Sequence, residues 1–530
     1  MRRKNDATAV AFVLGIVFVA ACGSSADDSG ASFGDGSAAD GGTSGPSVGG
    51  GASGDAGPEQ KAESSYQSPV ATGKYVWVAN PTSGRVAYID ATTLEVHTVE
   101  AGNGPTYLAP LVNPAVDSAI VLNVVSNDAT LLKANGSNVT ATNFEVAPGA
   151  NTWATSKDGR WAIAWTNAAS IKNPDPVDSF QDISVVDVTG VVAPVVLSVG
   201  FRPVSVGFTG NSQEAYAVTQ DGISIIDLTG ASPILEKNVA ISTDPLDDPG
   251  TRDVSVTPDG SLAFVRRDGQ PDITVVSLAD GTLVTVTLPG NVTDLRLSAA
   301  GDEALAVVRD SSTVGILPVP GIFTDPTTFQ TVSVTDDTVG SVVLSQSGST
   351  GLLYTSALPV DDMTVLAIGA SPTYRTLKLY SPVLAVFPTP DASYAVVLHD
   401  QLPAGTAHPG AFSIVPVSQN LPARIVGTLA PPTAVAMAPG NTRGIVAERD
   451  DTTEVYGAYI AKMPELTYDR YALASPPIAV GIVAGANRAY VAQEHPEGRI
   501  TFIDLGSGEA RTLTGFELAA RIVDGSNGGK

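Results

Sequence analysis

Apolar and polar residues alternate along most of the chain after residue 66. The stretch "KYVWVANPTSGRVAYIDATTLEVHTVEAG" (residues 74–102) contains three short runs with a period of two, each followed by turn residues. This alternation is typical of β-strands that bury one face, and no extended stripe with the helical period of 3.6 residues accompanies it. The pattern predicts an all-β protein.

The same pattern recurs along the rest of the chain at intervals of about 40–52 residues, the range in which four-stranded propeller blades repeat. Each recurrence opens with an apolar strand that a turn and three further strands follow. These opening strands are "PTYLAPLV" (105–112), "TWATS" (152–156), "PVSVGFTG" (203–210), "RDVSVTPDG" (252–260), "VTDLRLSAAG" (292–301), "GSVVLSQSG" (340–348), "PVLAVFPTP" (382–390), "TAVAMAPG" (433–440) and "PIAVGIVAG" (477–485).

Residues 74–102 contain only the last three strands of such a unit. A candidate for the missing first strand, "GFELAARIVDG" (515–525), lies at the opposite end of the chain. Pairing of the two ends would close a ring and remove its exposed edges. We therefore predict a β-propeller of about ten four-stranded antiparallel blades, closed by its N- and C-terminal strands. Because propellers usually have four to eight blades, two smaller rings or inserted units are alternatives, but the complementary ends favour one ring.

The N-terminus, "MRRKNDATAVAFVLGIVFVAACGSS", has the organisation of an export signal. A basic start precedes an apolar run that is too short to span a bilayer and that ends in small residues. The motif "VAAC" resembles a bacterial lipobox, which implies a signal peptide over residues 1–21 and lipidation of Cys22. Cys22 is the only cysteine of the chain, and the alternative is a stray cysteine after an ordinary signal peptide. We expect an exported protein anchored to the cell envelope by lipid, with the outer membrane favoured.

Residues 22–65 are rich in Gly, Ser and Asp and contain little to bury, so we expect a disordered linker ahead of a propeller domain over residues 66–530. The net charge of −25 and the pI of about 4.4 argue against nucleic acid as a partner. Such a charge would suit cationic ligands or would simply maintain solubility. We expect a monomer.

One unit resembles the YVTN family of bacterial surface β-propellers. The residues that carry the resemblance are Tyr75, Val76, Asn80, Asp90 and Gly102, followed by "GNGPTYLA". Other units retain only the aspartate at the end of the third strand, as in "ISVVDVTG", "ISIIDLTG" and "ITFIDLGSG". We expect these aspartates (Asp187, Asp227 and Asp504) to accept backbone N–H groups in turns, and not to be catalytic. The WD40 signature and the regular tryptophans of quinone-dependent propellers are absent from the sequence.

Candidate binding residues come from three long loops and from the ends of the second strands. The loops are residues 168–182, 242–253 and 400–411, and their enlargement on one face is typical of a binding face, although neutral insertion is the alternative. The strand ends carry charged or polar pairs that could bind a carboxylate or a sugar, or could only form surface ion pairs. The candidates are Arg252, Asp253, Arg267, Asp268, Arg309, Asp310, His399, Arg449 and His495.

Signals for metal binding and for covalent catalysis are weak in this sequence. The four histidines lack zinc-ligand spacing, and we expect no cofactor. Calcium is a weaker alternative, because Asp244, Asp247, Asp248 and Asp253 lack the spacing of an EF-hand loop. The sequence contains no nucleophile elbow and no P-loop.

Three hypotheses for the function remain open. The favoured one is a non-enzymatic lipoprotein whose propeller binds a protein or a glycan. The second is a hydrolase similar to propeller lactonases, with Arg, Asp and His residues in the central funnel. The third is a purely structural component of the envelope.

Overall fold

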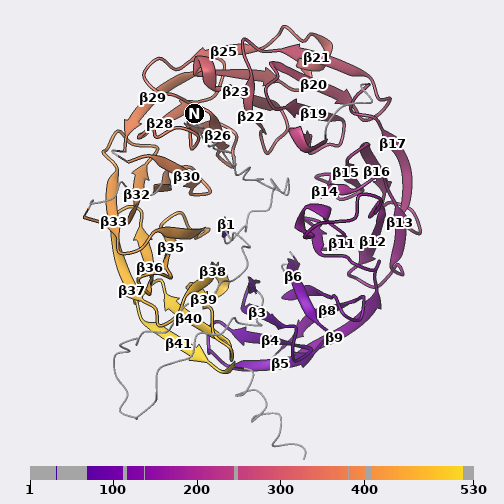
Figure 1. The fold of residues 1–530 in the computed structure, drawn as a ribbon, viewed down its shortest axis with the longest axis vertical. Helices are drawn as coiled ribbons and strands as arrows, with labels where there is room; N and C mark the ends of the chain where they lie inside the picture. Colours follow the sequence, from indigo (N-terminus) through magenta and orange to yellow (C-terminus); the bar gives the residue numbers. More distant parts are fainter. Residues whose placement is uncertain are drawn as a thin grey trace, which may run out of the picture.

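The computed structural model describes residues 31–32, 68–111, 116–136, 138–243, 249–379, 381–399 and 407–516. Within them the chain forms ten antiparallel sheets, each containing four strands that are consecutive in sequence. The sheets follow one another around a common centre, and the colours pass once around the ring from indigo to yellow (Figure 1). The predicted ten-bladed propeller is confirmed. The predicted signal peptide and Cys22 lie outside the described residues.

Each blade begins with its innermost strand, and the second, third and outermost strands follow in chain order. The innermost strands are β2 (Val70–Ala71), β6 (Pro105–Leu111), β10 (Thr152–Thr155), β14 (Pro203–Phe208), β18 (Arg252–Val256), β22 (Val292–Leu297), β26 (Ser341–Leu344), β30 (Val383–Pro388), β34 (Pro432–Met437) and β38 (Pro477–Val483). The second strands are β3 (Tyr75–Asn80), β7 (Ser118–Asn123), β11 (Trp161–Trp165), β15 (Glu214–Thr219), β19 (Leu262–Arg267), β23 (Glu303–Val308), β27 (Thr350–Tyr354), β31 (Tyr394–His399), β35 (Arg443–Asp450) and β39 (Arg488–Gln493). The nine predicted opening strands coincide with β6 to β38.

The third and outermost strands complete each blade. The third strands are β4 (Arg85–Asp90), β8 (Asp128–Asn135), β12 (Asp182–Asp187), β16 (Gly222–Asp227), β20 (Asp272–Ser277), β24 (Thr313–Pro318), β28 (Asp362–Ala367), β32 (Gly410–Pro416), β36 (Val455–Lys462) and β40 (Arg499–Asp504). The outermost are β5 (Val96–Glu100), β9 (Asn138–Glu145), β13 (Val195–Ser198), β17 (Ile234–Val239), β21 (Leu283–Thr287), β25 (Gln330–Ser333), β29 (Thr373–Lys378), β33 (Arg424–Thr428), β37 (Thr467–Ala472) and β41 (Ala510–Thr514).

A few short elements lie outside this scheme. The strand β1 (Ala31–Ser32) pairs antiparallel with β34. One helical turn, α1 (Gly321–Thr324), lies between β24 and β25. The described part of the chain also contains four 3-10 turns, η1 (Ala168–Ser170), η2 (Pro249–Thr251), η3 (Arg309–Ser311) and η4 (Ala484–Ala486). No helix among the described residues is long and apolar enough to cross a membrane.

The hydrophobic core is divided among the interfaces between blades. The second and third strands are almost fully buried, whereas the outermost strands alternate between exposed and partly buried residues. Each neighbouring pair of blades shares a cluster of buried apolar side chains. Because every interface is filled, the burial that stabilises the ring is distributed around its circumference.

The last blade packs directly against the first. One buried cluster contains Val76 and Ile89 of the first blade together with Val483 and Phe502 of the last. The Arg488 guanidinium also donates to the carbonyl oxygen of Ala91 at 2.8 Å across this seam. The chain therefore forms one closed ring, and the alternative of two smaller rings is wrong.

The closure of the ring differs from the prediction at the first blade. We predicted that residues 515–525 supply its innermost strand, but that position beside Val76 and Trp77 is held by β2, which immediately precedes β3 in sequence. Each blade is thus contiguous, and this part of the prediction is wrong. It failed because β2 is only two residues long, too short for an alternating pattern to be recognised. Residues 517–525 lie outside the described part of the chain.

The aspartates that end third strands have the predicted structural role. The Asp90 carboxylate accepts the amides of Thr92 and Thr93 at 2.8 and 3.1 Å. Asp187, Asp227 and Asp504 accept the amide two residues further on in the same way. Each closes the turn between the third and the outermost strand, so the recurring aspartate is a turn former in all four blades.

The two ends of the blades form two different faces of the ring. We call the loop face the one that carries the connections from second to third strands and the crossings from one blade to the next. The turn face carries the connections from first to second and from third to fourth strands. Since strands within a blade alternate in direction, this assignment is the same in all ten blades.

Candidate functional site

The three long loops singled out in the sequence all belong to the loop face. Residues 168–182 connect β11 to β12, residues 400–411 connect β31 to β32, and residues 242–253 cross from β17 to β18. Only the first of these loops is described in full. The enlarged connections therefore share one face, as predicted.

The nine candidate binding residues also lie at the loop face. Arg252 and Asp253 open the innermost strand β18, and the other seven lie at or just beyond the ends of second strands. Six of them lie in the neighbouring blades five and six, and the other three lie in the consecutive blades eight, nine and ten. Their local contacts divide them into residues in ion pairs, residues that contact a neighbouring blade, and a buried histidine.

The fifth blade contains the densest charge cluster of the candidate set, and its centre is a residue that the sequence reasoning missed. Arg266 is buried and contacts the exposed carboxylates of Asp253 and Asp268, the latter at 2.7 Å. It also donates to the carbonyl oxygen of Val292 in the next blade at 3.1 Å. Burial lowers the pKa of the Arg266 guanidinium, but the two carboxylates outweigh burial and raise it. The predicted Arg267 instead donates to the hydroxyl of Thr274.

Arg252 and Arg449 both connect neighbouring blades. The Arg252 guanidinium donates to the carbonyl oxygen of Gln220 in the fourth blade at 2.6 Å. The Arg449 guanidinium pairs with Asp451 within its own blade and with Glu494 in the last blade, at 2.9 and 3.1 Å. Both guanidinium groups thus connect neighbouring blades, and these contacts limit how far the side chains can turn toward a ligand.

The two histidines of the candidate set have different surroundings. His399 is buried, and its ring nitrogens lie 3.1 Å from the carbonyl oxygen of Pro382 and 2.7 Å from the hydroxyl of Ser413. Burial lowers the pKa of His399, so the imidazole is neutral near pH 7. His495 accepts the amide of Glu497 at 3.2 Å in the connection that follows β39. Arg309 and Asp310 lie in η3, where Asp310 is exposed.

A buried carboxylate in the ninth blade is a second feature that the sequence reasoning missed. Glu448 is fully buried, and its Oε2 accepts the amides of Leu429 and Ala430 at 2.8 and 3.1 Å and the hydroxyl of Tyr459 at 3.0 Å. Its Oε1 pairs with the guanidinium of Arg470 at 2.6 Å. Glu448 therefore fixes the crossing from the eighth blade to the ninth.

Hydroxyl groups perform the same function in other blades. The Ser184 hydroxyl accepts the amide of Ala147 at 2.7 Å, and the Ser224 hydroxyl accepts that of Gly200 at 3.0 Å. In both cases a buried side chain near the start of a third strand binds the backbone that arrives from the preceding blade. We call these contacts, together with those of Glu448 and His399, the crossing latches. The signal that could have revealed them is a polar residue near the start of a third strand, as for the two serines, or near the end of a second strand, as for Glu448 and His399.

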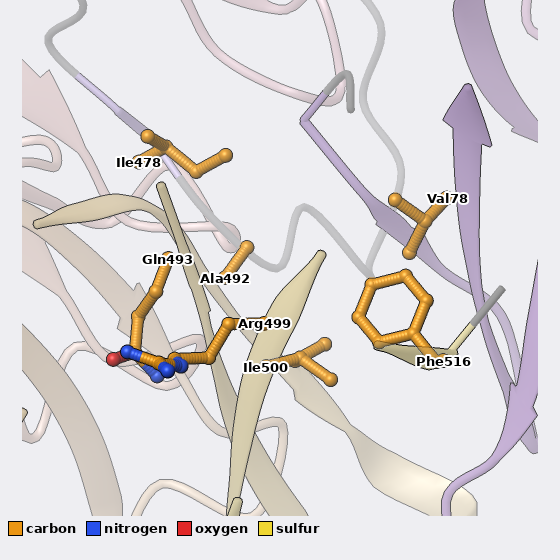
Figure 2. Close-up of a pocket in the computed structure, with 7 residues that line it drawn as sticks. All are labelled: Val78, Ile478, Ala492, Gln493, Arg499, Ile500 and Phe516. Carbon is orange, nitrogen blue, oxygen red and sulfur yellow. The ribbon is translucent and has the colours of Figure 1, made fainter. Parts of the chain in front are cut away.

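A small cavity lies at the seam between the first and last blades (Figure 2). Val78 and Phe516 lie on one side of it, and Gln493, Arg499 and Ile500 on the other (Figure 2). The Arg499 guanidinium donates to the hydroxyls of Ser475 and Thr514, both at 3.1 Å. The polar side chains that line this cavity are hydrogen-bonded to neighbouring residues. The cavity is therefore a packing gap and does not hold a convergent set of reactive groups.

Two further features bear on the chemistry of the site. Among the described residues, no group of three or more His, Cys, Asp or Glu side chains is arranged to hold a metal ion. The aspartates proposed for calcium lie largely in residues 244–248, outside the described part, and Asp253 pairs with Arg266.

No protein-family model and no curated protein sequence matches this chain. Among solved structures, it is similar to Kuenenia stuttgartiensis hydrazine synthase, with 16% identity, a TM-score of 0.33, and coverage of 61% of this chain and 100% of that one. It is also similar to the β-propeller domain of Cps50 (Swd1) from Myceliophteria thermophila, with 10% identity, a TM-score of 0.35, and coverage of 62% and 99%. For the dihydro-heme d1 dehydrogenase NirN in complex with DHE, the identity is 12%, the TM-score 0.38, and the coverage 66% and 76%. Similarity at this level does not support any conclusion about the ligand or the chemistry of this protein.

Proposed function

We propose that this protein is a lipid-anchored envelope protein whose propeller binds a partner, without catalysis, through its loop face. The observation that carries the proposal is the asymmetry of the ring. The long connections and the nine candidate residues share the loop face, and enlarged loops on one face of a repeat protein are typical of a binding face. The lipobox-like Cys22 and the YVTN-like unit support a location at the envelope of a bacterium.

Binding is favoured over catalysis by the arrangement of the titratable groups in the site. General acid–base catalysis needs groups that converge on one reacting centre. Here His399 is buried between Pro382 and Ser413. Three of the arginines, Arg252, Arg266 and Arg449, are paired with neighbouring carboxylates or backbone carbonyls. These contacts support a rigid charged surface, which suits recognition of another macromolecule.

Site-specific photo-crosslinking in intact cells tests this proposal. A photoreactive amino acid would replace Asp268 or Asp310 on the loop face, with Asp280 and Asp391 on the turn face as matched controls. We expect adducts of discrete mass only from the loop-face positions. Equal labelling from both faces, or none from either, would contradict binding at the loop face.

A further inference from the structure

Exposed apolar side chains gather on the loop face of blades two to four. Val177 is 81% exposed, Val125 70%, Val204 44% and Tyr107 38%. Val177 and Val125 lie in connections from second to third strands, and Tyr107 and Val204 lie near the first residues of β6 and β14. We call these four residues, with Val124, the apolar arc. Exposed apolar residues that gather in one place mark interaction sites more often than scattered ones do.

The segments that carry the apolar arc are connected across three neighbouring blades. The amide of Val124 donates to the carbonyl oxygen of Gly104, in the crossing that leads into β6. The indole of Trp153 in β10 donates to the carbonyl oxygen of Tyr107 at 3.1 Å. β10 also contacts β14, and η1 at the start of the loop 168–182 lies against β14. The arc therefore follows neighbouring inner strands.

The loop that carries Val177 is fixed by Arg202. The Arg202 guanidinium donates to the carbonyl oxygens of Asp175 and Asp178 at 2.6 and 2.9 Å. It also lies 5.8 and 5.2 Å from the ring centroids of Phe180 and Phe201, within the range of a cation–π contact. The loop is thus ordered before any partner arrives, which reduces the entropy lost on binding.

This order is maintained at a conformational cost. Phe180 and Arg202 adopt φ values of +46° and +48°, in the left-handed region that non-glycine residues seldom occupy. Residues held in this region are destabilising and are often found at binding sites. Val177 lies in the loop that these residues border, and its exposed side chain contributes nothing to the core.

The surroundings of the apolar arc are acidic. Around it, on the loop face of blades two to four, the exposed acidic residues outnumber the exposed basic ones by five to one. The acidic residues are Glu145, Asp175, Asp178, Asp182 and Asp221, and the basic residue is Lys172. An apolar surface within a negative border complements a segment that carries both apolar and cationic side chains.

We infer that the apolar arc binds a polypeptide segment of the partner in which apolar residues are combined with Lys or Arg. This inference rests on the proposed function and specifies its partner class. Carboxylates would pair with the cationic side chains, while Val125, Val177 and Tyr107 would cover the apolar ones. Partners of other chemistry, including neutral glycans, are outcomes of the test below.

Peptide binding to the purified full chain tests the inference. The probe is a fluorescent eight-residue peptide of alternating Lys and Leu, and the comparison peptides alternate Lys with Ser or Glu with Leu. We expect only the Lys–Leu peptide to bind tightly in an anisotropy titration. The variant Val125→Ser/Val177→Ser should weaken its binding at least tenfold.

Two valines with similar exposure outside the arc provide a matched control. Val191 is 81% exposed at a turn of the third blade, and Val196 is 53% exposed on its outermost strand. Val191→Ser/Val196→Ser should change the affinity less than twofold. Equal weakening by both double variants, equal binding of the Lys–Ser peptide, or binding of maltoheptaose in place of the peptide would overturn the inference.

A variant of the anchoring arginine tests the ordered loop separately. Arg202→Gln should lower the affinity about fivefold and make residues 168–182 more sensitive to protease, while the melting transition stays close to that of the parent. Parent-like affinity would remove the loop from the inference. Crosslinking from the loop face in cells together with failed peptide binding would contradict the partner class and leave the proposed function intact.

Discussion

The two faces of the ring are built by different rules. On the turn face, the same hydrogen-bonded turn recurs between first and second strands: Thr257 donates to Asp259 at 2.6 Å, and Thr389 donates to Asp391 at 2.8 Å. On the loop face, the connections vary in length, and the latches at four of the crossings differ in chemistry, from the carboxylate of Glu448 to the hydroxyl of Ser184. The uniform turns of the turn face are explained by folding alone. The variable loops of the loop face, held on a rigid ring, can be adapted to a binding partner.

The largest expected effect concerns the latch of the ninth blade. Glu448→Gln leaves the guanidinium of Arg470 without its buried carboxylate, and removal of one partner of a buried ion pair costs about 3–5 kcal/mol. We expect the midpoint of chemical denaturation to fall clearly while the slope is unchanged.

The control for this prediction is an ion pair at the opposite end of the same blade. Arg443 and Glu465 lie 3.3 Å apart on the turn face, with the Glu465 side chain 51% exposed. Exposed pairs contribute about 0–1 kcal/mol, so Glu465→Gln should have little effect. An equal loss of stability in the two variants would show that the buried ion pair of Glu448 contributes no more than an exposed one.

A smaller effect is expected from an acidic residue in the crossing between blades six and seven. Burial, with repulsion from Asp362 and Asp336, raises the pKa of Asp337 from 3.8 to about 6, although the hydroxyl of Thr364 donates to it. A carboxyl with a raised folded-state pKa costs stability above that pKa, and the cost is relieved as the pH falls from about 6 toward 4.

Asp337→Asn removes this charge at all pH values. We expect the variant to be more stable than the parent at pH 7 by about 1–2 kcal/mol, after allowance for solvent screening, and to lose the gain in stability between pH 6 and pH 4. Melting temperatures measured across this range check both statements. A parent curve that falls as the pH falls from 6, with no change in the variant, would refute this account of Asp337.

The turn face should show small and equal effects. Asp259→Ala and Asp391→Ala each remove one acceptor of the Thr hydroxyl and of the amide two residues further on. The net contribution of one such exposed hydrogen bond is about 0.5 kcal/mol, so the loss of the two should cost each variant about 1 kcal/mol in denaturant titrations. A large difference between the two variants would show that the turns of the fifth and eighth blades are not equivalent.

The fold could be predicted from the sequence because every blade repeats the same strand pattern. Nine opening strands, the turn-forming aspartates and the face of the long loops followed from alternation and spacing alone. The strand β2 was missed because two residues carry no period. Arg266 and Glu448 were missed because their importance depends on burial between blades, which is a property of the packed ring. Of the two neighbouring arginines at the end of β19, Arg266 is buried and Arg267 only half-buried, while the sequence reasoning chose Arg267.

The smallest expected effect on stability comes from the N-terminal segment, which contrasts with both faces. If Cys22 is lipidated, as its lipobox-like context suggests, the acyl chains supply about 0.8 kcal/mol of membrane affinity for each buried methylene. Cys22→Ala should then move the protein from the membrane fraction to the soluble fraction without changing its melting temperature. Deletion of residues 35–62, which retains β1 and whose composition offers little to bury, should leave both the membrane association and the melting temperature unchanged. Recovery of the Cys22→Ala protein with membranes would contradict the lipid anchor, and the loop face would then have to be tested for direct contact with the membrane.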